Sequence, residues 1–138
     1  MIIKKNSFIL FVILTGGFAG TGCNYQVISP HFNEEFYLNP GQKAEFKDSG
    51  LEITFNKVLE DSRCPEGVEC VWEGNGKIEL SVYQSVSGSE IKELNTALEP
   101  KQTESGNHKI RLTELQPYPK KDGEIESEKY RIRLLVEK

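Results

Sequence analysis

The chain has few of the side chains that bind metals or act as nucleophiles. It contains two histidines and three cysteines among 138 residues, whereas a structural zinc site needs about four such ligands at a recognised spacing. No serine lies in a Gly-x-Ser-x-Gly turn, and no Asp-x-Asp-x-Asp-Gly calcium loop is present. We therefore expect no metal, no cofactor and no enzymatic activity.

Basic clusters and long apolar runs are also missing. Lysine and arginine number 17 against 21 acidic residues, which gives a net charge of −4. This balance argues against nucleic-acid binding and against electrostatic docking on anionic lipid. The unbroken apolar run from Phe8 to Leu14 is far shorter than the roughly 20 residues that cross a bilayer.

The N-terminus has the order of segments typical of a secretory signal peptide. Lys4 and Lys5 precede the apolar run, and the small residues 20–22 come after it. Cys23 is next, and this arrangement resembles the lipobox of bacterial lipoproteins, in which the cysteine is lipidated at sulfur. We expect residues 1–22 to be removed and the lipid on Cys23 to hold the protein to a bacterial membrane. Secretion with cleavage at the same small residues is the alternative.

After this leader, residues 23–36 are polar and lack a sustained period, so we interpret them as a lipidated tether. Residues 37–138 form the predicted domain. Its dominant period is two, which indicates half-buried strands of an antiparallel sheet. The alternation is seen in residues 43–47, 51–55, 77–83, 108–115 and 129–138. It slips after Phe55, which predicts a β-bulge near Asn56 and Lys57.

Turn signals divide these segments. They are found at residues 39–42, 48–50, 87–89 and 105–107, and Asn75-Gly76 is typical of a two-residue hairpin. Residues 90–99 fit either a helix or a strand, and their β surroundings favour a strand. The sequence thus predicts an all-β protein, a single antiparallel, Ig-like β-sandwich of about seven to eight strands, whose last strand lies inside a sheet.

The segment from Asp61 to Gly76, DSRCPEGVECVWEGNG, is the most unusual part of the chain. With Cys23 lipidated, Cys64 and Cys70 remain, and a disulfide is the default in an exported protein. Pro65 and Gly67 bend the intervening five residues. The spacing fits neither a zinc knuckle nor a two-residue redox motif.

We expect the segment of residues 61–76, closed by this disulfide, to be a structural clip. Trp72 is interpreted as a large core anchor, and Glu66, Gly67 and Glu69 as an exposed tip that could bind a partner. The charged residues Asp61, Arg63, Glu69 and Glu73 are interpreted as a solvated loop. The alternative is that Arg63 pairs with a carboxylate and orders the clip.

The stretch FNKVLEDSRCPEGVECVWEGNGKIEL resembles a loop of small bacterial envelope lipoproteins of uncharacterised activity, Asp-Ser-Arg-Cys-Pro and then Cys-Val-Trp-x-Gly. The resemblance implies one β-sandwich-like domain behind a lipid anchor, and it brings no catalytic residue. Its matching positions form the structural loop; they are Asp61, Arg63, Pro65, Trp72 and Gly74.

Together these observations predict a non-enzymatic, lipid-anchored envelope protein that binds a protein, peptide or glycan. Two alternatives stay open. The protein could inhibit an extracellular enzyme through the loop of residues 64–70, or it could act as an enzyme on envelope polymer.

Overall fold

The computed structural model describes residues 26–138, which consist of β-strands and loops with one 3-10 turn. The predicted signal peptide and Cys23 lie outside the described residues. The elements are β1 (Val27–Ile28), β2 (Glu35–Leu38), β3 (Lys43–Phe46), β4 (Leu51–Asp61), β5 (Gly76–Gln84), β6 (Gly88–Asn95), β7 (Gln102–Ser105), β8 (His108–Gln116), η1 (Ser127–Lys129) and β9 (Arg131–Glu137). Within this part of the chain, no helix has the length and apolarity needed to cross a membrane.

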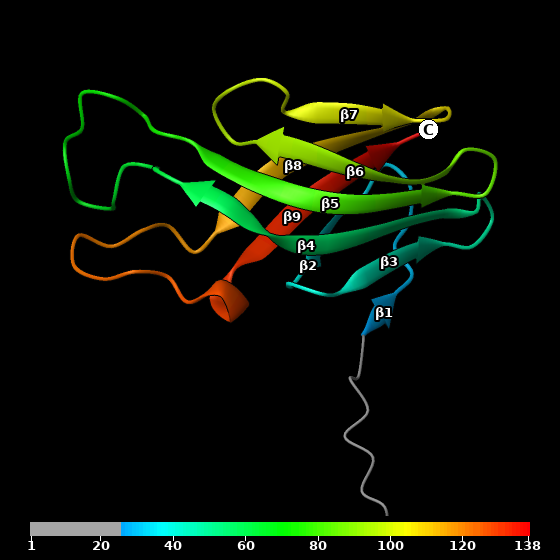
Figure 1. Ribbon diagram of the computed structural model, residues 1–138, viewed down its shortest axis with the longest axis horizontal. Helices are drawn as coiled ribbons and strands as arrows, with labels where there is room; N and C mark the ends of the chain where they lie inside the picture. Colours follow the sequence, from blue (N-terminus) through cyan, green and yellow to red (C-terminus); the bar gives the residue numbers. More distant parts are fainter. Residues whose placement is uncertain (1–25) are drawn as a thin grey trace, which may run out of the picture.

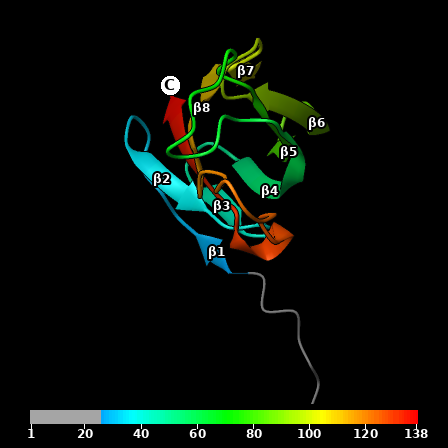
Figure 2. The ribbon, with the colours of Figure 1, turned by 90° about the vertical axis from the view of Figure 1, so that its left-hand side faces the viewer.

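The strands form two sheets that pack face to face (Figures 1 and 2). One sheet has the order β1-β3-β4-β5-β6 and the other the order β2-β9-β8-β7. Among the described residues, all strand pairs are antiparallel except β1 with β3, which is parallel. The predicted all-β sandwich is confirmed, although it has nine strands rather than seven or eight.

The additional strands lie mostly in the segment interpreted from the sequence as a tether, and that interpretation is wrong for residues 27–36. Val27 and Ile28 pair with β3, and β2 pairs with β9 from Glu35 onward. Phe36 is buried and packs edge-on against Phe46, with ring centroids 5.7 Å apart. β1 is too short to show a period, whereas β2 alternates, with Phe36 and Leu38 buried, and the boundary predicted after residue 36 divides it. The sandwich therefore begins at Val27.

The core lies between the sheets and has the same period of two. Alternate residues of β4, β5, β8 and β9 are buried, as expected for sheets with one solvated face. The buried apolar side chains come from both sheets; they are Phe36, Leu38, Ala44, Phe46, Leu51, Ile53, Phe55, Ile78, Leu80, Val82, Leu94, Ile110, Leu112, Leu115, Tyr130, Ile132, Leu134 and Val136.

β4 is the longest strand and carries the chain to the end of the sandwich where the clip begins. Its register against β5 shifts between Phe55 and Lys57, which confirms the predicted bulge, and shifts again between Val58 and Glu60. Each extra residue changes which face the subsequent side chains occupy. The strand ends at Asp61, opposite Gly76 in β5.

The remaining predictions of local structure are largely confirmed. Residues 90–95 belong to strand β6, and turns occur where the signals lie at residues 39–42, 48–50 and 105–107. The turn predicted at residues 87–89 lies at residues 85–87 instead, because β6 begins at Gly88. The predicted hairpin turn at Asn75-Gly76 is wrong. The long segment 62–75 connects β4 to β5, and Asn75 is a buried residue just before β5.

β9 lies between β2 and β8, which confirms that the last strand is inside a sheet. Ile132 of this strand is fully buried. We expect Ile132→Asp to abolish cooperative thermal unfolding, because an unpaired buried carboxylate costs several kcal/mol of a total stability of roughly 5–15 kcal/mol. Circular dichroism during heating measures this loss.

Ile91→Asp is the matched control, because Ile91 lies in a strand but is 59% exposed. This variant should melt close to the wild type. A cooperative transition of Ile132→Asp at the wild-type temperature would contradict the central position of β9.

Candidate binding site

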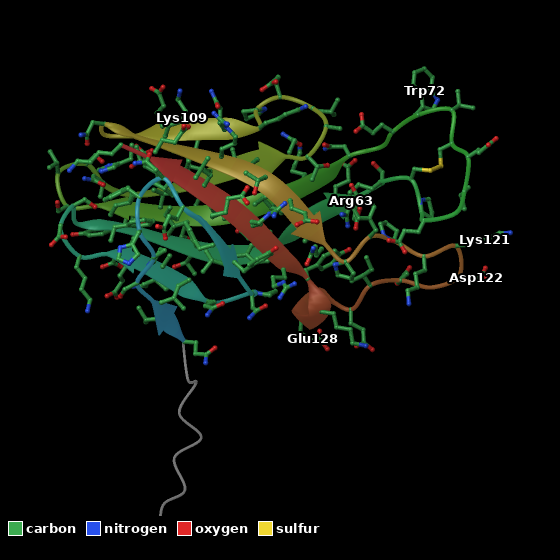
Figure 3. The ribbon with its side chains drawn as sticks, turned by 180° about the vertical axis from the view of Figure 1, so that it is seen from behind. Arg63, Trp72, Lys109, Lys121, Asp122 and Glu128 are labelled. Atoms are coloured by element: carbon green, nitrogen blue, oxygen red, sulfur yellow. A yellow bond between two sulfur atoms is a disulfide. The ribbon has the colours of Figure 1, made fainter. Side chains whose placement is uncertain are left out.

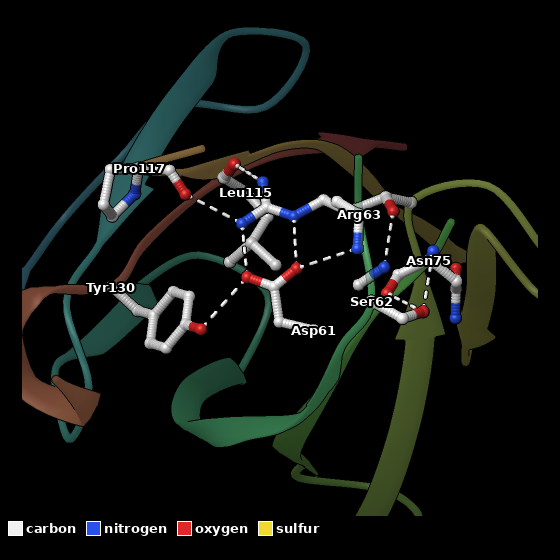
Figure 4. Close-up of polar contacts among 9 residues, drawn as sticks. Asp61, Ser62, Arg63, Asn75, Leu115, Pro117 and Tyr130 are labelled. Atoms are coloured by element: carbon white, nitrogen blue, oxygen red, sulfur yellow. Dashed lines mark hydrogen bonds and ion pairs between the residues drawn. The ribbon is translucent and has the colours of Figure 1, made fainter. Parts of the chain in front are cut away.

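A buried ion pair forms the root of the clip (Figure 4). Arg63 is 5% exposed, and its Nε and Nη2 donate to the two carboxylate oxygens of Asp61 at 2.7 Å each. This is the bidentate geometry in which arginine and carboxylate bind most strongly. Our favoured interpretation of these charges as a solvated loop is therefore wrong for Asp61 and Arg63, and the alternative holds.

Arg63 also contacts the end of β8 and the chain just after it. Its Nη1 donates to the carbonyl oxygen of Leu115, and Nη2 donates to that of Pro117 at 2.7 Å. The guanidinium carbon lies 4.8 Å from the centre of the Tyr118 ring. One side chain thus fixes the clip against the segment after β8, although the two are more than 50 residues apart in the chain.

Tyr130 completes this network from the start of β9. Its hydroxyl donates to Asp61 Oδ2 at 3.0 Å. Burial and the bond to the Asp61 carboxylate raise the pKa of Tyr130 to about 12. Burial alone would raise the pKa of Asp61, but the hydrogen bonds and charge of Arg63, with the Tyr130 hydroxyl, hold that pKa below its usual value. Asp61 therefore stays ionised at neutral pH.

Beyond the ion pair, residues 62–64 and residues 73–75 run side by side and form a hydrogen-bonded neck. The Ser62 amide donates to the Asn75 carbonyl at 2.8 Å, and the Cys64 amide donates to the Glu73 carbonyl at 3.0 Å. Gly74 has a φ of +73°, and a Cβ there would lie 1.9 Å from the Ser62 carbonyl oxygen. Only glycine suits this position, because both the backbone conformation and the space exclude a side chain.

Asn75 connects the part of the clip that leads into β5 to the end of β6 and the loop after it. Its side-chain nitrogen donates to Asn95 Oδ1 at 2.8 Å. Its side-chain oxygen accepts bonds from the amides of Ala97 and Leu98 at 3.2 and 3.3 Å. The buried amide group is thus satisfied on both sides, which explains why this Asn-Gly pair does not form a turn.

The disulfide closes the outer part of the clip. Cys64 and Cys70 are bonded, with their Cα atoms 5.9 Å apart, so the predicted disulfide is confirmed. Between them the Val68 amide donates to the Pro65 carbonyl at 3.3 Å, and Gly67 has a φ of +74°. The Glu66 amide donates to the Pro119 carbonyl at 3.0 Å, which connects the clip to the loop of residues 117–130.

Residues 65–72 form the tip of the clip, and this tip exposes its largest apolar side chains. Trp72 is 81% exposed and Val71 is 90% exposed, and Figure 3 shows Trp72 pointing away from the sandwich. The prediction that Trp72 anchors the core is wrong, because the neck carries this part of the chain beyond the end of the packed sheets. Glu66, Gly67 and Glu69 are exposed, as expected for a tip.

A cleft of about 240 Å³ lies between the neck of the clip and β8. Arg63, Glu73 and Gly74 line it on the clip side, and Leu112, Glu114 and Tyr118 on the other. The loop of residues 117–130 projects from the same end of the molecule as the clip (Figures 1 and 3). This end therefore combines a projecting loop, which exposes Val71 and Trp72, with a small cleft beside its neck.

Neither histidine takes part in this end of the molecule. His31 is exposed, whereas His108 is buried and stacks on Phe32 with ring centroids 5.0 Å apart. Within residues 26–138, no three His, Cys, Asp or Glu side chains come together as a metal site would require.

No protein-family model, curated protein or solved structure matches the chain. The resemblance of the clip sequence to envelope lipoproteins therefore stays a prediction.

Sequence reasoning missed the long-range contacts of the root. Asp61 and Arg63 are two residues apart, so a local pairing between them can be read from the sequence. The bonds to Leu115, Pro117 and Tyr130 join segments more than 50 positions away. No local pattern signals such contacts.

The root network should be needed for stability. We expect Asp61→Asn to lower the free energy of unfolding at pH 7 by about 3–5 kcal/mol, because it leaves the Arg63 guanidinium buried without a counter-charge. Urea unfolding of the oxidised protein measures the change. Glu126→Gln is the matched control, since it removes a carboxylate from an exposed pair with Lys129, and it should change stability by less than about 1 kcal/mol.

The stabilisation that the Asp61 charge provides should be lost only toward acidic pH. The folded pKa of Asp61 is below its usual value of 3.8, so its charge stabilises the folded state fully above that value. This contribution is lost as pH falls through the folded pKa. The difference between wild type and Asp61→Asn should thus shrink in acid, and a difference that grows there would contradict the assignment.

Proposed function

We propose that this protein is a non-enzymatic protein of the bacterial cell envelope, held to a membrane by lipid on Cys23, that binds a protein partner through the clip. The observation that carries the proposal is the exposure of Trp72 and Val71 at the tip of a braced, disulfide-closed loop.

Single exposed apolar side chains are common, whereas contiguous exposed apolar surface marks binding sites. Val71 and Trp72 are adjacent and exposed on one projecting loop. Tryptophan is among the residues that contribute most to protein–protein affinity when a partner covers it. The neck, the disulfide and the bond from Glu66 to Pro119 hold the tip in one conformation. A partner therefore binds with little loss of loop entropy.

The shape of the tip favours a protein over a small ligand. Small molecules bind in concave sites, whereas Trp72 points outward from a convex loop (Figure 3). Inhibition of an extracellular enzyme is less well supported. An inhibitor that imitates an extended substrate needs an extended loop, but Pro65 to Val68 form a tight turn.

The buried polar network supports a structural role better than catalysis. Asp61 and Tyr130 have shifted pKa values, which is common at active sites but also in structural ion-pair networks. Both groups bond to each other, and Arg63 occupies the remaining side of the carboxylate. The network braces the clip rather than facing a substrate.

The early start of the sandwich bears on how the protein would sit at the membrane. Only residues 24–26 separate Cys23 from β1, and a chain of that length spans at most about 14 Å when fully extended. A lipid on Cys23 would therefore keep the β1 edge close to the bilayer. The clip extends from one end of the long strands β4 and β5 (Figure 1), so its partner would be another protein at the membrane surface.

The anchor can be tested by intact mass. Protein purified from the membranes of its own host should carry the mass of diacylglycerol on Cys23. Two alkyl groups should be added only after reduction, because Cys64 and Cys70 are bonded to each other. A protein without lipid would contradict the anchor and remove the argument for a partner at the membrane surface.

A substitution at Trp72 should weaken binding without affecting folding. A photo-crosslinking amino acid placed at Val71 in the native host should trap a defined protein. We expect Trp72→Ala to weaken this binding at least about 30-fold, as for an interface residue worth about 2 kcal/mol. Thermal unfolding should be unchanged, because Trp72 is exposed.

Val86→Ala is the matched control, since Val86 is 91% exposed in the β5–β6 turn at the opposite end of β5. It should leave the crosslink intact. Equal trapping in the wild type and in Trp72→Ala would overturn the clip as the binding surface.

A further inference from the structure

The cleft beside the clip has room for one amino-acid side chain. Its volume of about 240 Å³ is below the roughly 300–1,000 Å³ of sites that hold drug-sized ligands. Glu73, on its wall, is the residue next to the exposed Trp72. The cleft therefore begins one residue after Trp72 in the chain, on the neck that carries the tip.

The walls of the cleft suit a long aliphatic side chain with a positive end. Leu112 and Leu115 are buried apolar residues that line it, and Tyr118 adds an aromatic wall. The acidic residues that line it are Glu73 and Glu114. Lysine and arginine have this combination of an apolar stem and a charged head.

The positive charge already present does not neutralise these carboxylates fully. Arg63 lines the cleft, but its guanidinium is paired with Asp61 and bonded to two backbone carbonyls. Glu114 is 3.2 Å from Arg133, in a pair whose members are about one-third exposed. Glu73 has no ion-pair partner among the described residues.

The exposed charged residues of the clip itself are acidic. Within residues 62–75, Arg63 is the only lysine or arginine, and it is buried. Glu66, Glu69 and Glu73 are exposed there. A partner with a basic surface would be electrostatically complementary to the clip, whereas an acidic partner or an anionic bilayer would be repelled.

We propose that the protein partner of the clip inserts a lysine or arginine side chain into the cleft between the clip and β8, with its charged head between Glu73 and Glu114, while its apolar surface covers Trp72. This inference rests on the proposed binding function and names the chemistry of the partner.

A small probe tests the cleft directly. Nα-acetyl-L-arginine amide should shift the NMR amide signals of Gly74 and Leu115 in the detergent-solubilised full chain, with a Kd in the millimolar range. Its neutral analogue Nα-acetyl-L-citrulline amide should shift them at least about fivefold less at equal concentration. Equal shifts by both probes, or none by either, would overturn the proposal.

Removing the carboxylates provides the second test. The double variant Glu73→Gln, Glu114→Gln should bind the arginine probe at least about fivefold more weakly and unfold at nearly the wild-type temperature. The matched control Glu34→Gln, Glu104→Gln removes two exposed carboxylates away from the cleft and should bind the probe as the wild type does. Equal weakening by both variants would mean that net charge, not the cleft, attracts the probe.

The crosslink from Val71 separates this inference from the function on which it rests. If the partner is a basic protein that uses the cleft, Glu73→Gln, Glu114→Gln should weaken trapping as Trp72→Ala does. If trapping depends on Trp72 but not on the two carboxylates, the binding function stands and the basic side chain is rejected. If it depends on neither, the binding function itself is rejected.

Discussion

The buried pair of Arg63 and Asp61 is the interaction on which the end of the sandwich depends. A guanidinium removed from water must find hydrogen-bond acceptors for its donors, and here they come from Asp61, Leu115 and Pro117. These acceptors belong to the end of β4 and to the chain at the end of β8 and just after it. Satisfying one side chain therefore fixes two loops that share no local sequence.

The irregular strand β4 places Asp61 where this pair forms. The two register shifts of β4 determine which face the residues beyond Phe55 occupy, and the strand delivers Asp61 opposite Gly76. Gly76 leaves the space that Arg63 and Leu115 use, since a Cβ there would lie 2.6 Å from a Leu115 methyl group and 3.4 Å from the Arg63 chain. The small residue in β5 and the long residue after β4 are thus complementary.

Local period and local chemistry are enough to predict the long strands and the disulfide, whereas contacts between distant segments decide the rest. The alternation of residues 77–83 and 129–138 marks β5 and β9 because a half-buried strand has a period of two. The disulfide is expected from compartment and cysteine number. β1 could not be found this way, because two residues show no period and their position depends on β3. β2 does alternate, with Phe36 and Leu38 buried, but the boundary predicted after residue 36 divides its four residues. The burial predicted for Trp72 fails for a related reason: hydrophobicity predicts burial, but the neck decides where the side chain can go.

The exposure of Trp72 is maintained by the neck, which continues the chain outward from the buried ion pair. An unbraced loop could fold back and cover a tryptophan with its own apolar residues, because burial of that surface is favourable. The neck bonds of Ser62 and Cys64, and the glycine conformation at Gly74, direct the tip outward. The residues that stabilise the loop and the residues that it exposes are therefore different members of one short segment. The buried root keeps the loop in place, and the exposed tip is free to change without unfolding the sandwich.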